Sequence, residues 1–362
     1  MNAFDGDLCP RLARVLAREL PLWRGLAMEP LRDTGLAHSH VRLVGCGAVA
    51  RVPKQSQTAL SPVDNLAYQA TCFGRAAASG HTPALRHVLP VSDELPRGAL
   101  LVEEIVGHAA TLPQDLGTIA RALARIHALP LPNGQERPPL DDASDPLFAL
   151  LTEIEGQARH LESAAFAARV RRAINVEIER LRRLCGRQAR PAKTLVSVDA
   201  HPGNFIVKAD GEAVLVDLEK CRYSYPPLDL AHATLYTSTS WDLDNRATLT
   251  PAEVAATYAL WAAECGRGAA EWCDWHLPLR RAMWLWSLTW CAKGRVVSKY
   301  PTPAVAGGED WSAASGTAVL FDHVRDRVAH YLSTEGVERV LAEFDALVAL
   351  RPFTTSAMES DR

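Results

Sequence analysis

The sequence lacks long hydrophobic runs, and this absence excludes membrane insertion. No stretch of the 362-residue chain approaches the roughly 20 apolar residues that a membrane-spanning helix needs. The opening Met-Asn-Ala-Phe-Asp-Gly-Asp carries acids early and has no basic segment before an apolar core, so a secretory signal is not predicted. We therefore expect a cytoplasmic protein with no membrane partner.

Paired cysteines and a strong charge of one sign are also missing. The eight cysteines are scattered, with no Cys-x-x-Cys pair and no histidines at zinc-ligand spacing, so we expect free thiols in a reducing compartment. The net charge is only −3 and no nucleic-acid-binding motif is present, so no nucleic-acid partner is expected. The composition is that of an ordinary globular protein, long enough for two lobes.

The most informative stretch lies just past the middle of the chain. Two short runs rich in β-branched residues, 205–208 and 213–216, flank an Ala-Asp-Gly turn and predict a hairpin. Asp199 and Asn204 precede the hairpin and Asp217 follows it, so all three are expected at one end of it. Phosphoryl transfer uses such a trio, with one carboxylate for the attacking hydroxyl and an Asn and an Asp for magnesium.

Three motifs in order make a resemblance specific. Asp199-Ala-His-Pro-Gly-Asn204-Phe, Val216-Asp217-Leu-Glu219 and Pro227-Leu-Asp229-Leu-Ala231 resemble the aminoglycoside phosphotransferase and choline kinase superfamily. The resemblance is strongest from 195 to 231 and looser elsewhere. It implies an α+β, bilobal, protein-kinase-like fold with a small antiparallel-sheet lobe and a mainly helical lobe. It also implies ATP and magnesium as cofactors and a small-molecule acceptor.

The same resemblance assigns roles to the motif residues. Asp199 is expected to be the catalytic base or hydroxyl-orienting group, with Asn204 and Asp217 as metal ligands and Asp229 as a structural brace. The N-terminal nucleotide lobe is expected over 1–106, the catalytic and acceptor lobe over 107–350, and a disordered tail over 351–362. Whether the nucleotide is ATP or GTP cannot be read from the sequence, nor can the acceptor.

On the nucleotide side, the resemblance points to one basic residue and one linker. Arg51, in the predicted strand 48–52, corresponds to the residue that touches the phosphates. Lys54 is the competing candidate, but it follows Pro53 and is expected beyond the strand. The backbone of Glu103 and Ile105, where a buried strand enters the linker, is expected to read the adenine edge.

Several positions depart from the family pattern. Ser197 and Val198 stand where the family usually has His-Gly, and Leu218 replaces an aromatic residue. On the predicted helix 63–79, Gln69 stands where protein kinases have a Glu that pairs with the phosphate-binding basic residue. Gln69 can hydrogen-bond Arg51 but cannot neutralise it. These changes keep open a second hypothesis, a degenerate nucleotide-binding pseudokinase, although the intact trio favours an enzyme.

Further helices are predicted from apolar periodicity, and one of them is rich in tryptophan. Helices are expected over 8–26, 63–79, 112–129, most of 147–184, 252–265, 275–297 and 321–331. His127, at the end of one, is more simply a locally satisfied side chain than a base.

Trp284, Trp286 and Trp290 lie within seven residues, and at 100° per residue only Trp286 and Trp290 share a face. Filling the core is the ordinary role of such rings. The alternative is a site for a cationic amine on the acceptor. Trp284 is its favoured member by loose resemblance to choline kinases. The candidate carboxylates nearby are Asp242, Asp244 and Asp274.

Overall fold

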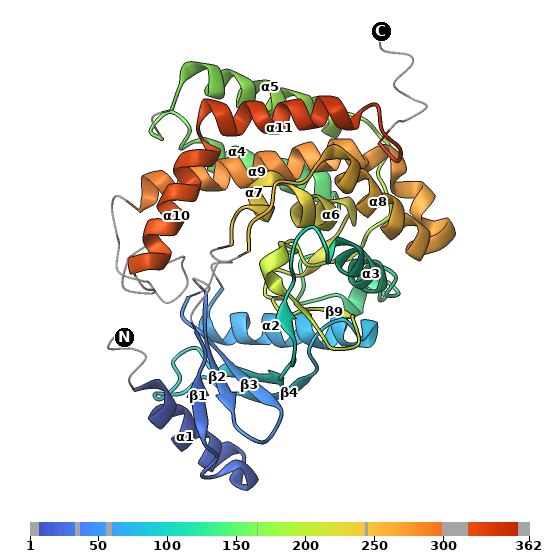
Figure 1. Ribbon diagram of the computed structural model, residues 1–362. Coiled ribbons are helices and arrows are strands. Elements are labelled where there is room, and N and C mark those ends of the chain that lie inside the picture. The colour runs from blue at the N-terminus through green and yellow to red at the C-terminus, as the bar shows by residue number, and fades with distance from the viewer. Residues whose placement is uncertain are drawn as a thin grey trace.

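A computed structural model describes residues 7–32, 37–55, 60–164, 166–242, 245–298 and 318–353. The chain forms a small lobe built on a β-sheet and a larger lobe built mostly of helices (Figure 1). This arrangement confirms the predicted α+β class. The predicted lobe limits of 106 and 107 remain a prediction.

The small lobe is built on one antiparallel sheet with the strand order β1-β2-β3-β5-β4. Its strands are β1 (Met28–Pro30), β2 (His38–Leu43), β3 (Ala48–Pro53), β4 (Leu85–Leu89) and β5 (Ala99–Glu103). The sequence predicts a turn at Gly35–Ser39, but His38 and Ser39 already belong to β2, and residues 33–36 lie outside the described part of the chain. Arg51 lies within β3 and Lys54 follows its end, as predicted.

The side chains of β5 alternate between two cores, as strand geometry requires. Ala99 and Leu101 pack with α1 (Leu8–Glu19), whereas Leu100 and Val102 join the main core with α2 (Pro62–Ala76). The two helices therefore cover opposite faces of the sheet. The first helix is shorter than the predicted 8–26, because Leu20 has left the helical conformation and a short 3-10 turn follows at Pro21–Trp23.

The large lobe contains the remaining helices. They are α3 (Leu116–His127), α4 (Pro146–Ala158), α5 (Ala168–Cys185), α6 (Pro227–Thr234), α7 (Tyr236–Thr239), α8 (Pro251–Cys265), α9 (His276–Val297), α10 (Ala318–Tyr331) and α11 (Thr334–Leu347). The predicted 147–184 segment is two helices. No helix in the described part of the chain combines the length and apolar character needed to cross a membrane.

Two small sheets carry the central motifs. The predicted hairpin is present as β8 (Phe205–Val207) and β9 (Ala213–Leu215), with β6 (His108–Ala109) beside β8. The strands β7 (Thr194–Val196) and β10 (Arg222–Ser224) pair antiparallel on either side of the hairpin in sequence. The loops from β7 to β8 and from β9 to β10 therefore lie at one end of this structure.

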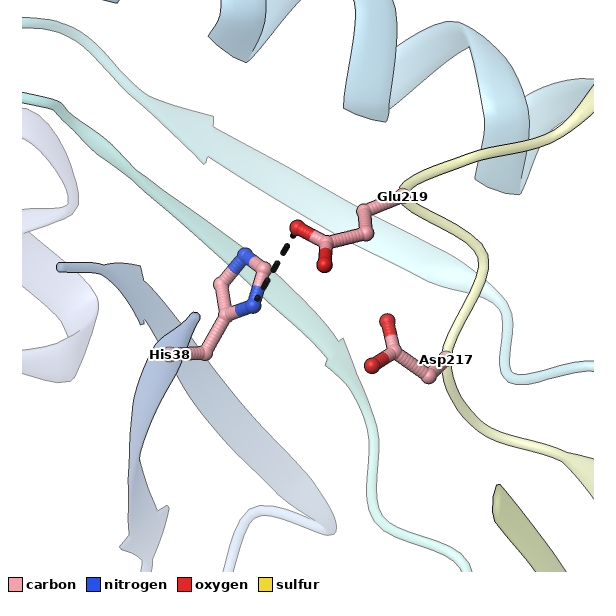
Figure 2. Close-up of side chains that lie close together, drawn as sticks. All are labelled: His38, Asp217 and Glu219. Atoms are coloured by element: carbon pink, nitrogen blue, oxygen red, sulfur yellow. Dashed lines mark ion pairs between the residues drawn. The ribbon is translucent and has the colours of Figure 1, made fainter. Parts of the chain in front are cut away.

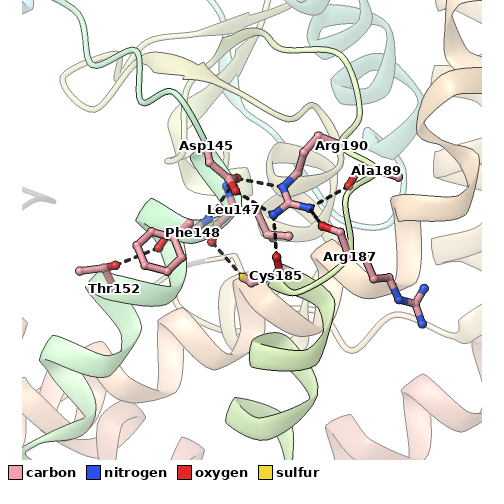
Figure 3. A network of polar contacts seen from close by, with 8 residues as sticks. All are labelled: Asp145, Leu147, Phe148, Thr152, Cys185, Arg187, Ala189 and Arg190. Carbon is pink, nitrogen blue, oxygen red and sulfur yellow. Dashed lines mark hydrogen bonds and ion pairs between the residues drawn. The ribbon is translucent and has the colours of Figure 1, made fainter.

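Polar contacts around Asp145 and Arg190 hold together the two helices that precede β7 (Figure 3). Asp145 caps α4 by accepting the N–H groups of Leu147 and Phe148. The same carboxylate binds Arg190 through two nitrogens, at 3.0 and 2.7 Å, and Arg190 also donates to the carbonyl oxygen of Cys185 at the end of α5. Bidentate charged pairs of this kind are strong and directional. These contacts join the start of α4 to the end of α5, and Arg190 lies four residues before the first residue of β7.

The predicted disordered tail begins too early. Phe353 is fully buried against the rings of Tyr258 and His276. Residues 351–353 therefore belong to the fold. Burial of an aromatic side chain such as that of Phe353 stabilises the folded state by about 2 kcal/mol. Residues 354–362 lie outside the described part of the chain.

Candidate active site

A cavity of about 270 Å³ lies where the two lobes meet. Its wall includes His38, His40 and Arg51 from the small lobe, and Asp199, Asn204, Asp217, Glu219, Lys220, His232, Trp241, Trp286, Trp290 and Tyr331 from the large lobe. The structure thus brings together Asp199, Asn204 and Asp217, which the sequence separates by a hairpin. Ligands commonly bind at such lobe junctions.

The backbone of the loop that carries Asp199 is hydrogen-bonded to the side chain of Asp229. The carboxylate of Asp229, on α6, accepts the N–H of Ser197 at 2.7 Å and the N–H of Val198 at 2.8 Å. Asp229 is fully buried, and its third partner is His127 Nε2 at 3.1 Å. The geometry is that of the predicted brace.

His127 is committed to this brace on both ring nitrogens. Trp261 donates its indole N–H to His127 Nδ1 at 3.0 Å, so Nδ1 is the acceptor and Nε2 carries the proton given to Asp229. The imidazole is buried and lies outside the cavity wall. This agrees with the prediction that His127 is a locally satisfied helix-end residue.

Asn204 is oriented by the loop that it closes. Its side-chain amide donates to the backbone oxygen of Asp199 at 2.8 Å, and its own backbone carbonyl accepts from Val216 at 2.9 Å. With the nitrogen engaged, Oδ1 is the atom left for a ligand. This bond also fixes the spacing between Asp199 and Asn204.

Arg51 reaches across from β3 and binds Asp217. Its guanidinium donates to Asp217 Oδ1 at 2.7 Å and to the carbonyl oxygen of Val216 at 2.9 Å, and it lies over the ring of Phe73. Burial disfavours the charged carboxylate, but the positive charge of Arg51 outweighs burial and holds the pKa of Asp217 well below its usual range. Asp217 is therefore ionised at neutral pH.

Behind this pair, His38, Asp217 and Glu219 form a compact group (Figure 2). One ligand atom from each lies within 4.8 Å of the others. His38 Nδ1 is 3.6 Å from Glu219 Oε2, and His38 Nε2 is 3.0 Å from Gln69 Oε1. Burial and the nearby charge of Asp217 raise the pKa of Glu219 to about 8, and burial lowers the pKa of His38 to about 3.

Gln69 thus pairs with a different residue from the one predicted. The sequence suggested that Gln69 hydrogen-bonds Arg51. In the structure, the side-chain oxygen of Gln69 is hydrogen-bonded to His38 on β2. Since a neutral His38 can donate one N–H, the pair needs no charge. The α2 helix is tied to the site through β2.

A lysine that the sequence did not single out binds the proposed catalytic carboxylate. Lys220 Nζ lies 2.7 Å from Asp199 Oδ2, and His232 Nδ1 lies 4.0 Å from Asp199 Oδ1. Burial disfavours ionised Asp199, but the charge of Lys220 prevails and holds the pKa of Asp199 below its usual value. Burial lowers the pKa of His232 to about 4, so that ring is neutral at pH 7.

The donor set fits magnesium. Asp217 supplies an ionised carboxylate and Asn204 a carbonyl oxygen, which are the hard oxygen ligands that Mg²⁺ prefers beside phosphates and water. Glu219 adds a third oxygen within reach of Asp217. Cys291 also lines this wall, but burial raises the pKa of its thiol well above the usual value, so it does not supply the thiolate that softer metals favour.

The three tryptophans divide between the core and the cavity. Trp286 and Trp290 line the cavity, in keeping with their shared helix face. The expectation for Trp284 is wrong: its ring is fully buried, edge-on to Phe344, with centroids 5.6 Å apart. Trp284 faces away from Trp286 and Trp290 and packs against α11.

Another tryptophan takes its place in the wall. Trp241 lies edge-on to Trp290, with centroids 5.9 Å apart, and stacks on Tyr331 at 6.3 Å. Of the candidate carboxylates, Asp242 lines the cavity and Asp274 does not, and Asp244 is outside the described residues. No strong sequence signal identified Trp241, because it lies in a turn between helices.

The predicted adenine contacts lie away from this cavity wall. Glu103 donates its N–H to the carbonyl oxygen of Ala84, and its side chain accepts the N–H of Ala84, so that amide is already satisfied. Ile105 is half-buried in the segment after β5. The role of both residues stays a prediction, and for Glu103 it is confined to the carbonyl oxygen.

Comparisons with known proteins agree on fold and family. A sequence profile described as "Phosphotransferase enzyme family" matches residues 48–267. Among curated protein sequences, none matches.

Solved structures that resemble the chain come from several sources. An ethanolamine kinase from Plasmodium vivax has a TM-score of 0.61 at 11% identity, covering 92% of this chain and 89% of that one. A putative aminoglycoside phosphotransferase from Ralstonia eutropha has a TM-score of 0.56 at 13% identity, with 91% and 98% covered. A choline/ethanolamine kinase family protein from Mesorhizobium loti has a TM-score of 0.52 at 16% identity, with 94% and 99% covered. The shared architecture confirms the predicted kinase-like fold.

Proposed function

The chain belongs to the phosphotransferase enzyme family, and from this premise we propose that it is an ATP- and magnesium-dependent phosphotransferase. In this proposal it transfers the γ-phosphoryl group of ATP to a hydroxyl of a small, amine-bearing molecule. The observation that carries the proposal is the convergence of Asp199, Asn204, Asp217 and Arg51 on one cavity between the lobes.

Each residue has a role that follows from its contacts. Asp199 accepts or orients the proton of the acceptor hydroxyl, whose oxygen forms the new bond to phosphorus while the bond to the ADP oxygen breaks. Asn204 and Asp217 would hold magnesium, and Arg51 would contact the phosphates. When bound, magnesium neutralises charge on the phosphate oxygens. Asp229 and His127 keep the loop of Asp199 in place.

The amine on the acceptor is supported by the aromatic side of the cavity. Trp241, Trp290 and Tyr331 present rings to it, and Asp242 adds a carboxylate. An ammonium over an indole face is stabilised by about 0.5–2 kcal/mol. The proposal for the amine rests on these rings and no longer on Trp284.

The second candidate function, a pseudokinase that binds nucleotide without transferring phosphate, has one observation in its favour. Both essential carboxylates are bound by basic side chains, Asp217 by Arg51 and Asp199 by Lys220. A protein that binds a nucleotide without transferring phosphate would tolerate such pairs permanently. The complete set of ligand and base residues favours the enzyme.

Acceptor-dependent ADP release separates the two functions. The protein is incubated with Mg-ATP and a panel of amino sugars, amino alcohols, neutral sugars and nucleosides. We expect ADP release with an amine-bearing hydroxyl compound. In Asp199→Asn, turnover should fall about 10²–10⁴-fold with nucleotide binding retained. Nucleotide binding with no acceptor-dependent ADP release across the panel would instead support the pseudokinase.

A further inference from the structure

A second cavity, of about 330 Å³, lies beside the first, and all of the described residues that line it belong to the large lobe. Its ionisable wall residues are Glu153, Arg159, His160, Lys220, Arg222 and Lys293, and we call it the basic cavity. None of the small-lobe residues that face the active-site cavity contributes to this wall. The basic cavity is therefore on the acceptor side of Asp199 and away from Arg51.

The two cavities share a wall. Lys220, Trp286 and Trp290 line both of them. On α9, Trp286, Trp290 and Lys293 are spaced by four and three residues, so they lie along one face of the helix. A molecule whose hydroxyl is at Asp199 can therefore extend past the two indole rings toward Lys293 within one continuous surface.

The described wall of the basic cavity is rich in cationic side chains. The Lys220 ammonium is already paired with Asp199 at 2.7 Å. Glu153, the carboxylate of the wall, accepts the indole N–H of Trp286 at 2.7 Å and lies 3.5 Å from Arg222. Arg159, Arg222 and Lys293 are the other Arg and Lys side chains among the described residues of this wall.

Arg222 connects the basic cavity to the active site. Its terminal Nη1 lies 3.5 Å from Glu153, whereas its Nε is buried beneath the wall. Arg222 begins β10 two residues after Lys220, so the same short segment contributes to both cavities.

We propose that the acceptor carries an anionic group, a carboxylate or a phosphate monoester, which the basic cavity binds through Arg159, Arg222 and Lys293. This inference rests on the proposed function, because it takes the hydroxyl of the acceptor to lie at Asp199. Guanidinium groups bind both kinds of anion through paired, charge-assisted hydrogen bonds. Together with the amine proposed beside Trp241, it makes the acceptor zwitterionic rather than simply cationic.

Matched pairs of acceptors test the proposal through turnover. Serine differs from ethanolamine by a carboxylate, and glucosamine 6-phosphate differs from glucosamine by a phosphate. We expect kcat/KM for the anionic member of at least one pair to exceed that of its partner by roughly tenfold or more. The pair that shows the preference identifies carboxylate or phosphate as the group. Equal or better turnover of the members that lack the anionic group, in both pairs, would overturn the proposal.

Variants locate the preference. In Arg159→Ala, Lys293→Ala and the double variant, the advantage of the anionic member should shrink, while turnover of its partner is retained. Arg172→Ala, which removes an exposed arginine on α5, is the matched control and should change neither. A preference that survives the double variant would place the anion elsewhere and reject the basic cavity.

A binding measurement keeps this inference separate from the proposed function. Calorimetry with inorganic phosphate is done in the presence of saturating Mg-ADP, which occupies the nucleotide side. Wild-type protein should bind phosphate, and the double variant should bind it roughly tenfold or more weakly. This result can hold even if no acceptor is turned over. Phosphate binding that is absent, or unchanged in the double variant, would refute the basic cavity as an anion site.

Discussion

Asp229 holds Val198 in a backbone conformation that valine rarely adopts. Val198 has a φ of 57°, in the left-handed region, and its N–H donates to Asp229 Oδ1 at 2.8 Å. This strained residue stands directly before Asp199, where the resembled family usually has glycine. Strain of this kind costs about 1–3 kcal/mol and persists only where the surroundings impose it.

The strain at Val198 predicts an unusual mutational result. Val198→Gly loses buried methyl groups but gains relief of the left-handed backbone, whereas Val196→Gly, at a buried strand position, gains no such relief. Chemical denaturation should therefore show Val198→Gly to be less destabilising by about 1–3 kcal/mol. Equal losses of stability in the two variants would mean that Val198 is not strained.

Lys220 is expected to set the protonation of Asp199. Lys220→Met removes the cation 2.7 Å from the carboxylate and keeps the apolar stem, so the pKa of Asp199 should rise. The acid limb of the kcat/KM profile for acceptor phosphorylation should then move to higher pH. Lys208→Met, on the hairpin surface, is the control. An unmoved acid limb would show that Lys220 does not act through Asp199.

Asp217 should supply the magnesium-dependent part of nucleotide affinity. Asp217→Asn keeps an oxygen for Arg51 but loses the anionic metal ligand, so calorimetry should show ATP affinity that no longer increases with magnesium. Asp217→Ala is a poorer test, because an unpaired buried Arg51 would cost about 3–5 kcal/mol of stability. Unchanged Mg-ATP binding in Asp217→Asn would contradict the assignment.

Arg51 should matter for nucleotide binding more than Lys54 does. Arg51 lies in β3 and faces the cavity, and Lys54 lies beyond the strand and is not part of that wall. Arg51→Ala should weaken ATP binding and Lys54→Ala should leave it near normal. Arg51→Lys should restore only part of the affinity, since lysine lacks the planar fork. The reverse pattern would show that Lys54 is the phosphate contact.

His276 predicts a loss of stability in acid. Burial lowers its pKa from 6.5 to about 4, so the unfolded chain binds a proton more readily than the folded one between these values. Its contribution is complete above pH 6.5 and disappears as the pH falls toward 4, by about 3 kcal/mol in total. Unfolding measured across this range should be less pH-dependent in His276→Phe. Parallel curves for the two proteins would disprove the effect.

The parts of the site that depend on local spacing could be predicted from the sequence. The hairpin, the placement of Asp199, Asn204 and Asp217 at one end of it, and Arg51 within a strand all follow from short patterns. The family motifs extended this to the kinase-like fold. Each of these features needs only a few neighbouring residues to specify it.

What could not be predicted depends on partners far away in the chain. The pairs Lys220–Asp199 and His38–Gln69 join segments separated by 21 and 31 residues, and the Trp261–His127 bond spans 134. Helical periodicity separated Trp284 from Trp286 and Trp290 but could not say which face meets the cavity. The core contact with Phe344 decides it.

The contact between Arg51 and Asp217 also bears on how a nucleotide enters. Because Arg51 belongs to β3 and Asp217 to the loop after β9, their ion pair is a bond between the two lobes. Under the proposed assignments, both side chains must give up some of this contact to serve phosphate and magnesium. Nucleotide binding is then an exchange of partners rather than an addition of new ones. The net affinity for nucleotide then reflects the difference between the ionic contacts of the free protein and those of the complex. A substitution of Arg51 or of Asp217 alone changes both sets of contacts at once.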